Sequence, residues 1–153
     1  MRIRFGTYGF LDNHLLEMIS VSGGYEFFTS DNHIIQKYNF KEKKSLYSDS
    51  VSYRLSAKKY TNIRGYNVNT YCFFKGIVFF VENYSERKFI LRPLEEAMKY
   101  FKDFPRHGYD PIYEATEEEI SDIWEERTPI DGFKFDVEPI VYIKKDGVWL
   151  VEH

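Results

Sequence analysis

The fold is indicated most directly by the C-terminal stretch PIVYIKKDGVWLVE, residues 139–152. Two apolar runs flank the pair Asp146–Gly147. An Asp-Gly pair in this setting is a strong signal for a two-residue β-turn, because both residues tolerate positive φ angles. We therefore predict a C-terminal β-hairpin of strands 139–145 and 148–152. Both strands are apolar on their two faces, which is typical of the interior of a sheet.

Further strand patterns precede this hairpin. Residues 66–81 predict a second hairpin that turns at Lys75–Gly76. In residues 51–55, apolar and polar side chains alternate, as expected for a strand with one buried and one solvated face. Arg2–Phe5, which alternates between basic and apolar residues, predicts a first strand, and Tyr25–Thr29 and Ile34–Phe40 also predict strands.

Two segments have the period of an amphipathic helix. Residues 93–104 place apolar and charged side chains on opposite sides, and Pro105 ends the helix. Residues 116–127 begin with Thr116 and Glu119 in the spacing of a capping box. A third, shorter helix near the N-terminus is one interpretation of the pattern there, and a strand is the alternative.

These patterns predict the α+β class, with a mainly antiparallel sheet, two or three packed helices and a C-terminal β-hairpin. The chain has 153 residues, close to the usual size of one domain, and it contains no internal repeat. We therefore predict that residues 1–153 form a single α+β domain. The 14 Phe and 13 Tyr residues favour pleated sheet surfaces.

The one cysteine, Cys72, cannot form an internal disulfide, and its apolar surroundings predict a small buried side chain. A chain with neither a cysteine pair nor a signal peptide is typical of a reducing compartment. The longest apolar stretch, residues 71–81, is much shorter than the roughly 20 residues of a membrane-spanning helix. We therefore expect a soluble, cytoplasmic protein that does not contact a membrane.

Charge is divided unevenly along the chain. Residues 1–109 contain 17 Lys and Arg against 11 Asp and Glu, whereas residues 110–153 contain 4 against 13. On the predicted helix, five carboxylates fall within an arc of about 120°. They are Glu118, Glu119, Asp122, Glu125 and Glu126. Because carboxylates in a row mimic phosphates, we predict a partner-binding surface for a basic protein, the alternative being a solvated helix face.

The more basic half of the chain supports a competing hypothesis. Cations and aromatic residues are interleaved there: Lys41, Lys43, Lys44, Lys58, Lys59 and Arg64 with Phe40, Tyr47, Tyr53, Tyr60 and Tyr66. Such residues on a sheet can hold the phosphates of a single-stranded nucleic acid while its bases stack. The usual RNA-binding motifs are absent and the isoelectric point is about 5.8, so nucleic-acid binding is the alternative and not the main prediction.

No catalytic motif is present, since the sequence has no Gly-rich phosphate loop, no cysteine pair and no nucleophile elbow. Turns and helix caps explain Asp12–Asn13–His14 and Asp31–Asn32–His33, although paired histidines could bind a metal if the fold brought them together. His107, Asp110 and Glu114 form another generic ligand set. We predict no catalytic, cofactor or metal site and no enzyme, the alternative being a small enzyme built from scattered residues.

In overall character, this small, acidic and aromatic-rich chain resembles the bacterial immunity proteins that neutralise toxins of contact-dependent growth inhibition and related polymorphic toxin systems. No residue motif defines that class, so no functional residue is carried over. The resemblance implies a cytoplasmic, non-catalytic protein in a tight complex with a cognate toxin, often a nuclease with a basic active-site cleft. The five carboxylates are the contact that charge and periodicity predict.

Overall fold

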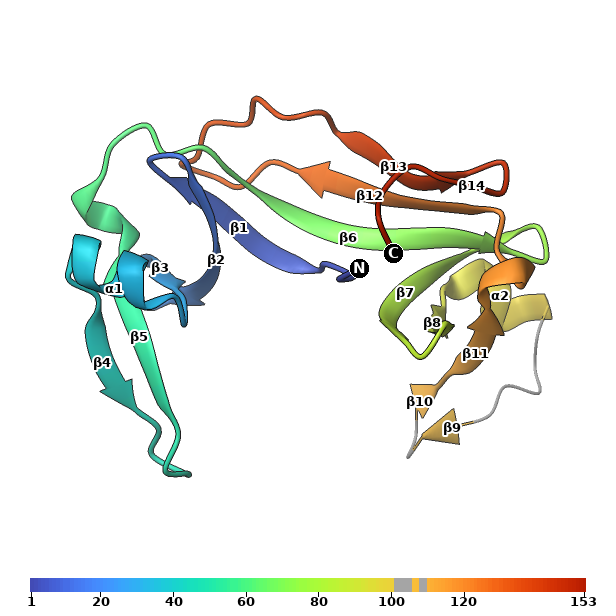
Figure 1. The fold of residues 1–153 in the computed structure, drawn as a ribbon, viewed down its shortest axis with the longest axis horizontal. Helices are drawn as coiled ribbons and strands as arrows, with labels where there is room; N and C mark the ends of the chain where they lie inside the picture. The colour runs from blue at the N-terminus through green and yellow to red at the C-terminus, as the bar shows by residue number, and fades with distance from the viewer. Residues whose placement is uncertain (101–105, 108–109) are drawn as a thin grey trace. The chain divides into compact units, whose positions relative to one another are not determined.

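Antiparallel strands dominate the structure, a computed structural model that describes residues 1–100, 106–107 and 110–153 (Figure 1). Strands account for 53% of these described residues and helices for 13%. The protein is therefore mainly β, and the α+β class with two or three packed helices is wrong. The physical reason is that most of one predicted helix forms a strand, while the two described α-helices have only seven and six residues.

The fold divides into two compact units. The N-terminal unit contains residues 6–67 and 128–136, and the C-terminal unit contains residues 1–5, 68–127 and 137–153. Each unit has its own apolar core. A single domain over the whole chain stays a prediction.

The N-terminal unit is an antiparallel sheet in the strand order β1-β2-β3-β5-β4. Its elements are β1 (Gly6–Leu11), β2 (His14–Val21), β3 (Gly24–Phe28), α1 (Asn32–Tyr38), β4 (Lys41–Lys44), β5 (Val51–Ser56) and the 3-10 helix η1 (Ala57–Lys59). Strand residues such as Met18, Phe27 and Leu55 pack with Ile34 of α1 to form the core. The helix therefore contributes one buried anchor to a core that the strands dominate.

The helix α1 lies where a strand over residues 34–40 was predicted, and that prediction is wrong. Asp31 caps the helix, because its carboxylate accepts hydrogen bonds from the backbone nitrogens of His33 at 2.9 Å and Ile34 at 3.3 Å. Asn39 ends it in the left-handed region, with a φ of 57°. Caps at both ends stabilise the helix over the extended alternative.

In the C-terminal unit, β6 (Gly65–Phe74), which begins in the other unit, pairs with β7 and with β12. The sheet continues as β7-β8-β11 on one path and β12-β13-β14 on the other. The elements are β7 (Ile77–Ser85), β8 (Lys88–Pro93), α2 (Glu95–Tyr100), β9 (Arg106–His107), β10 (Asp110–Pro111), β11 (Tyr113–Thr116), the 3-10 helix η2 (Glu117–Glu119), β12 (Asp122–Thr128), β13 (Ile140–Lys145) and β14 (Val148–Trp149). The core of this unit contains Cys72, Phe79, Leu91 and Ile123, with Ala97 from α2.

Two predictions for the C-terminal unit are met in full or in part. Lys75–Gly76 forms the turn between β6 and β7, with positive φ angles at both residues. The helix predicted over residues 93–104 is present as α2 over residues 95–100, and residues 101–104 lie outside the described part of the chain.

Residues 116–127 do not form the predicted helix. The capping box is present, because the Glu119 carboxylate accepts a hydrogen bond from the Thr116 backbone nitrogen at 3.0 Å. The helix nevertheless ends after one 3-10 turn, and the chain is already extended at Ile120. β12 follows and pairs with β13. The Ile and Trp residues of this segment favour a strand. The strands that pair with it, β6 and β13, lie elsewhere in the sequence, where a local period does not detect them.

The C-terminal hairpin turns at Asp146–Gly147 as predicted, with φ angles of 51° and 80°. The Gly147 backbone nitrogen also donates to the Ser121 carbonyl at 2.9 Å. The strands are not in the interior of the sheet, however, because Ile140 is 53% and Val148 is 60% exposed. Among the described strands, β14 pairs with β13 alone. The apolar runs are therefore divided, because Ile143 lies in the core while Ile140 and Val148 are exposed.

Replacing Gly147 by alanine is expected to destabilise the fold by about 1 kcal/mol, because only glycine adopts its φ of 80° without cost. An added Cβ meets no atom within 4 Å, so the effect isolates backbone strain. Urea denaturation measures the difference. Asp146→Asn is the matched control, because asparagine also tolerates positive φ, and it should change stability by less than about 0.5 kcal/mol.

The Cys72 thiol is expected to react with a thiol reagent at pH 8 about a thousand-fold more slowly in the folded protein than in urea. The side chain is fully buried in the core, and burial raises the pKa of Cys72 to about 12. Both effects suppress the reactive thiolate. Colorimetric thiol labelling measures the two rates, and comparable rates in both states contradict the burial of this side chain.

Candidate functional site

One face of the sheet in the C-terminal unit carries a row of aromatic side chains, which we call the aromatic face. Side chains alternate across a strand, so Cys72 and Ile123 point into the core while Tyr71, Phe73 and Trp124 lie on the opposite surface. The aromatic face comprises Phe5, Tyr71, Phe73, Phe80, Trp124 and Tyr142.

Neighbouring rings of the aromatic face contact one another across four strands. The ring centroids of Phe80 on β7 and Tyr71 on β6 are 6.1 Å apart. Trp124 on β12 lies 6.3 Å from Tyr71 and 5.1 Å from Phe73, and Tyr142 on β13 lies 6.1 Å from Trp124. These separations are those of edge-to-face and tilted aromatic pairs, so the rings support one another in fixed positions.

Part of the aromatic face is open to solvent. Phe5 is 54%, Phe73 40% and Tyr142 36% exposed, and the exposed Ile140 lies two residues from Tyr142 on the same strand. Trp124, which contacts both Phe73 and Tyr142, is only 7% exposed. Exposed aromatic residues grouped around a buried Trp are typical of protein-binding surfaces.

The five carboxylates predicted to form a partner-binding surface do not share one surface, because the helix that would have aligned them is absent. Glu118 and Glu119 are exposed on η2, where Glu118 lies 3.8 Å from the guanidinium of Arg87. Asp122 accepts a hydrogen bond from the Asp146 backbone nitrogen at 2.8 Å. Asp122 therefore holds the turn of the C-terminal hairpin.

Glu125 is buried and forms a structural ion pair. Its carboxylate accepts two hydrogen bonds from Arg4, both at 2.8 Å, and two from Arg127 at 2.9 and 3.3 Å. Burial alone would raise the pKa of Glu125, but the hydrogen bonds from Arg4 and Arg127 outweigh it and lower the pKa below its ordinary value. This charge is neutralised within the unit and does not face a partner.

Glu126 is the one of the five that lies at the aromatic face. The Trp124 indole Nε1 donates to its carboxylate at 3.1 Å. Burial raises the pKa of Tyr71, and the charge of Glu126 raises it further. A half-exposed carboxylate thus lies beside the rings.

The aromatic face was not predicted, although the sequence contains a signal for it. Residues 71–74, Tyr-Cys-Phe-Phe, lie in the hairpin predicted over residues 66–81 and are apolar on both faces of a strand. Alternation puts Tyr71 and Phe73 together on one side, but their exposure depends on what covers that side.

His14 and His33, the pair considered as metal ligands, belong to no metal-binding group among the described residues. His14 and His33 lie in the N-terminal unit, where the His14 ring is 6.1 Å from the Tyr38 ring. The side chain of His107 lies outside the described residues. Across residues 1–99 and 112–153, no group of three or more His, Cys, Asp and Glu side chains could hold a metal ion.

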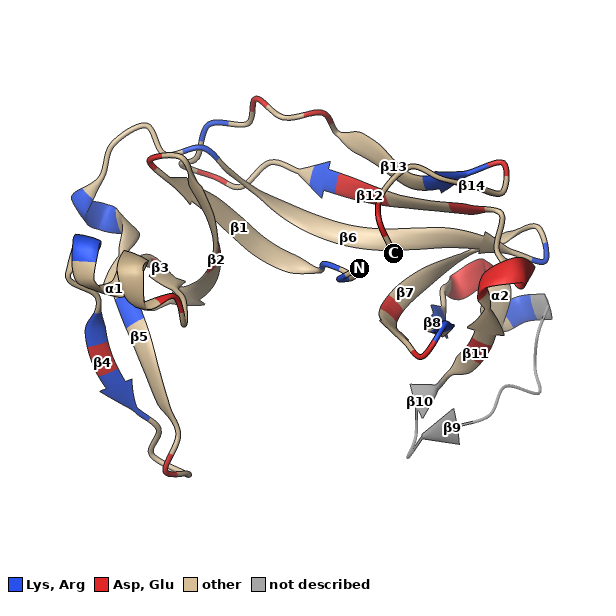
Figure 2. Cartoon of the chain, viewed as in Figure 1, with Lys and Arg blue, Asp and Glu red and all other residues tan. Residues whose placement is uncertain are grey.

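The basic and aromatic residues of the alternative hypothesis are only partly brought together. β4 supplies Lys41, Lys43 and Lys44, and Figure 2 shows basic residues concentrated on this strand and on η1. Arg64 is engaged elsewhere, because it stacks on Phe10 and lies 3.4 Å from the Asp136 carboxylate.

Within the described part of the chain, no helix is long and apolar enough to cross a membrane. No protein-family model, curated protein or solved structure matches the chain. Its function is therefore argued from its own residues.

Proposed function

We propose that this protein is a non-catalytic bacterial immunity protein that binds and neutralises a cognate toxin in the cytoplasm, without a cofactor. The observation that carries this proposal is the aromatic face, with Phe5, Phe73 and Tyr142 exposed on one sheet surface. Large aromatic side chains bury much area with few rotatable bonds, so they supply much of the affinity at protein interfaces. A protein partner that covers them removes this apolar surface from water.

The charge of the partner follows from the acidic C-terminal part of the chain. Residues 110–153 contain 13 Asp and Glu against 4 Lys and Arg. Three of these four cations already contact groups of the same unit: Arg127, Lys144 and Lys145. Glu118 is exposed and Glu126 is half-exposed. The remaining negative charge favours a basic partner, such as a nuclease with a cationic cleft.

The test uses the protein encoded directly upstream, because immunity genes follow their toxin genes. The full chain and the upstream protein are co-expressed, and size-exclusion chromatography measures the complex. We expect a stable complex, loss of the toxin's activity in it, and growth of cells that otherwise die. An upstream protein that is neither bound nor inhibited overturns the proposal.

Reversing the charge of two acidic residues tests their contribution to toxin binding. Glu118→Lys with Glu126→Lys is expected to slow association about ten-fold at low salt and to reduce its salt dependence, because exposed charges act mainly on the encounter rate. Glu42→Lys with Asp49→Lys is the matched control, since it makes the same charge change at exposed positions of the N-terminal unit. If the two double variants slow association equally, the net charge of the protein is responsible, and the surface that carries Glu118 and Glu126 does not contact the toxin.

A further inference from the structure

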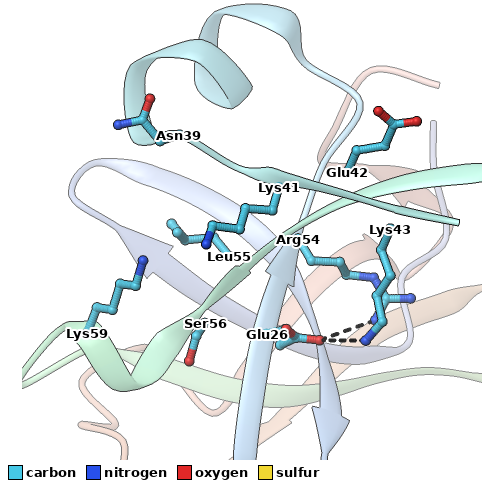
Figure 3. A pocket seen from close by; sticks show the side chains of 9 residues that line it. All are labelled: Glu26, Asn39, Lys41, Glu42, Lys43, Arg54, Leu55, Ser56 and Lys59. Carbon is cyan, nitrogen blue, oxygen red and sulfur yellow. Dashed lines mark hydrogen bonds and ion pairs between the residues drawn. The ribbon is translucent and has the colours of Figure 1, made fainter.

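A cavity of about 240 Å³ opens in the N-terminal unit beside β4, β5 and η1 (Figure 3). Four cations from these three elements line it: Lys41 and Lys43 of β4, Arg54 of β5 and Lys59 of η1. The register explains their convergence, because Lys41 pairs with Arg54 and Lys43 pairs with Ser52. Paired residues project from the same face of a sheet.

A carboxylate compensates two of these four cations. The Glu26 carboxylate lies 3.6 Å from Lys43 Nζ and 3.5 Å from Arg54 Nη1. Over the residues that the structure describes, Lys41 and Lys59 form no ion pair. Two ammonium groups in this cavity thus have no ion-pair partner among the described residues, although Glu42 also lines the cavity.

The arrangement of the side chains favours an anion between these two ammonium groups. Figure 3 shows Lys41 and Lys59 reaching toward one another across the cavity, while Glu42 is turned away. The Ser56 hydroxyl oxygen accepts a hydrogen bond from the Lys58 backbone nitrogen at 3.3 Å, and its hydrogen can therefore donate to a ligand. Like charges that line one cavity repel each other, so an anion that binds both ammonium groups is stabilised.

We propose that this cavity binds the phosphate group of a phosphorylated ligand. Ammonium and guanidinium groups form strong, charge-assisted hydrogen bonds with phosphate oxygens, and Arg54 adds a planar donor to the lysines. This site goes beyond toxin binding, because it lies in the N-terminal unit and uses none of the residues of the aromatic face.

A second cavity extends the first and indicates two sources for the phosphate. It measures about 440 Å³, shares Lys43 and Arg54 with the first cavity, and continues to Lys44 and Tyr47. Tyr47 is 96% exposed, so a base can stack on its ring. The phosphate therefore belongs either to a free nucleotide or to the backbone of a short single strand.

The test measures binding of the full chain to a fluorescein-labelled oligothymidylate of about eight nucleotides, a length within the range of single-strand sites. Fluorescence anisotropy gives the affinity, with thymidine 5′-monophosphate and inorganic phosphate as competitors. Lys41→Gln with Lys59→Gln should weaken binding at least ten-fold. The slope of log affinity against log salt concentration should fall by about 0.7, because the two lysines hold one phosphate and each phosphate contact with a single strand contributes about 0.7.

Lys37→Gln with Lys134→Gln is the matched control, because it removes the same charge from exposed positions of the same unit outside both cavities. It should weaken binding no more than about two-fold, within the small effect of distant exposed charges. Displacement of the oligonucleotide by the monophosphate assigns the cavity to free nucleotides, and failure of that displacement assigns it to the backbone. Both results support phosphate binding.

Three results overturn the proposal. One is that the protein binds none of the phosphate probes. Another is an equal loss of affinity in the control pair, which means that net charge is responsible. The third is equally tight binding of poly-L-glutamate that depends on Lys41 and Lys59, because carboxylates would then replace phosphate. Circular dichroism shows whether each variant is folded.

Discussion

Replacing Glu125 by alanine is expected to lower the free energy of unfolding by about 3 kcal/mol, the lower end of the range for breaking a buried ion pair. The carboxylate binds Arg4 through two hydrogen bonds and Arg127 through two more. All three side chains are less than one-fifth exposed, so water replaces the lost contacts poorly. Urea denaturation followed by circular dichroism measures the loss.

Glu125→Gln keeps the shape of the side chain and removes its charge. The free energy of unfolding of this variant, measured against pH, therefore gives the contribution of the charge alone. The lowered pKa of Glu125 means that the ion pair contributes fully above the ordinary carboxylate pKa of about 4.3. That contribution is lost as the pH falls through the lower pKa of the folded state. The stability difference between the natural chain and the Gln variant should therefore be largest near pH 7 and should narrow in acid.

Glu138→Ala is the control for this series, because Glu138 is an exposed carboxylate in the same unit. It should change stability by less than about 0.5 kcal/mol. Equal losses in the two alanine variants, or a Glu125→Gln difference that stays constant with pH, contradict a stabilising ion pair at Glu125.

The features that the sequence predicted correctly are those set by adjacent residues. Asp146–Gly147 and Lys75–Gly76 form the predicted turns because positive φ angles at two neighbours are a local requirement. The capping interaction between Thr116 and Glu119 was also correct, since three residues suffice to form it.

The predicted acidic helix was wrong because its period was compatible with two structures. A helix puts Glu125 and Glu126 on one face, opposite Trp124. A strand instead puts Glu125 and Glu126 on opposite faces. The pairing of β12 with β13 selects the strand, and Arg4, which binds Glu125, lies 121 residues away. Both β13 and Arg4 are too far away in the sequence for the local pattern around residues 116–127 to indicate them.

The candidate site could be predicted only in part for the same reason. Glu126 was among the predicted residues and lies at the aromatic face, whereas Glu125 was included and is buried. The exposure of Phe73 and Tyr142 depends on which strands neighbour β6 and β13 and on what covers the sheet. Sequence alternation assigns a residue to a face, but it does not say whether that face is covered.

Replacing Phe73 or Tyr142 by alanine is expected to weaken the complex with the toxin by about thirty-fold or more, corresponding to at least about 2 kcal/mol for a residue that dominates an interface. Both rings contact Trp124, so a partner that covers this centre excludes water from all three. Because the lost contacts form only in the bound state, the effect should appear as faster dissociation with little change in association.

Tyr47→Ala is the matched control, because Tyr47 is an exposed aromatic residue of the N-terminal unit and does not belong to the aromatic face. It should leave the affinity for the toxin within about two-fold, as expected for a residue outside the interface. Biolayer interferometry gives both rate constants. The aromatic substitutions should change dissociation, whereas reversing Glu118 and Glu126 should change association. A toxin complex that dissociates equally slowly in the Phe73 and Tyr142 variants shows that the toxin binds another surface of the protein.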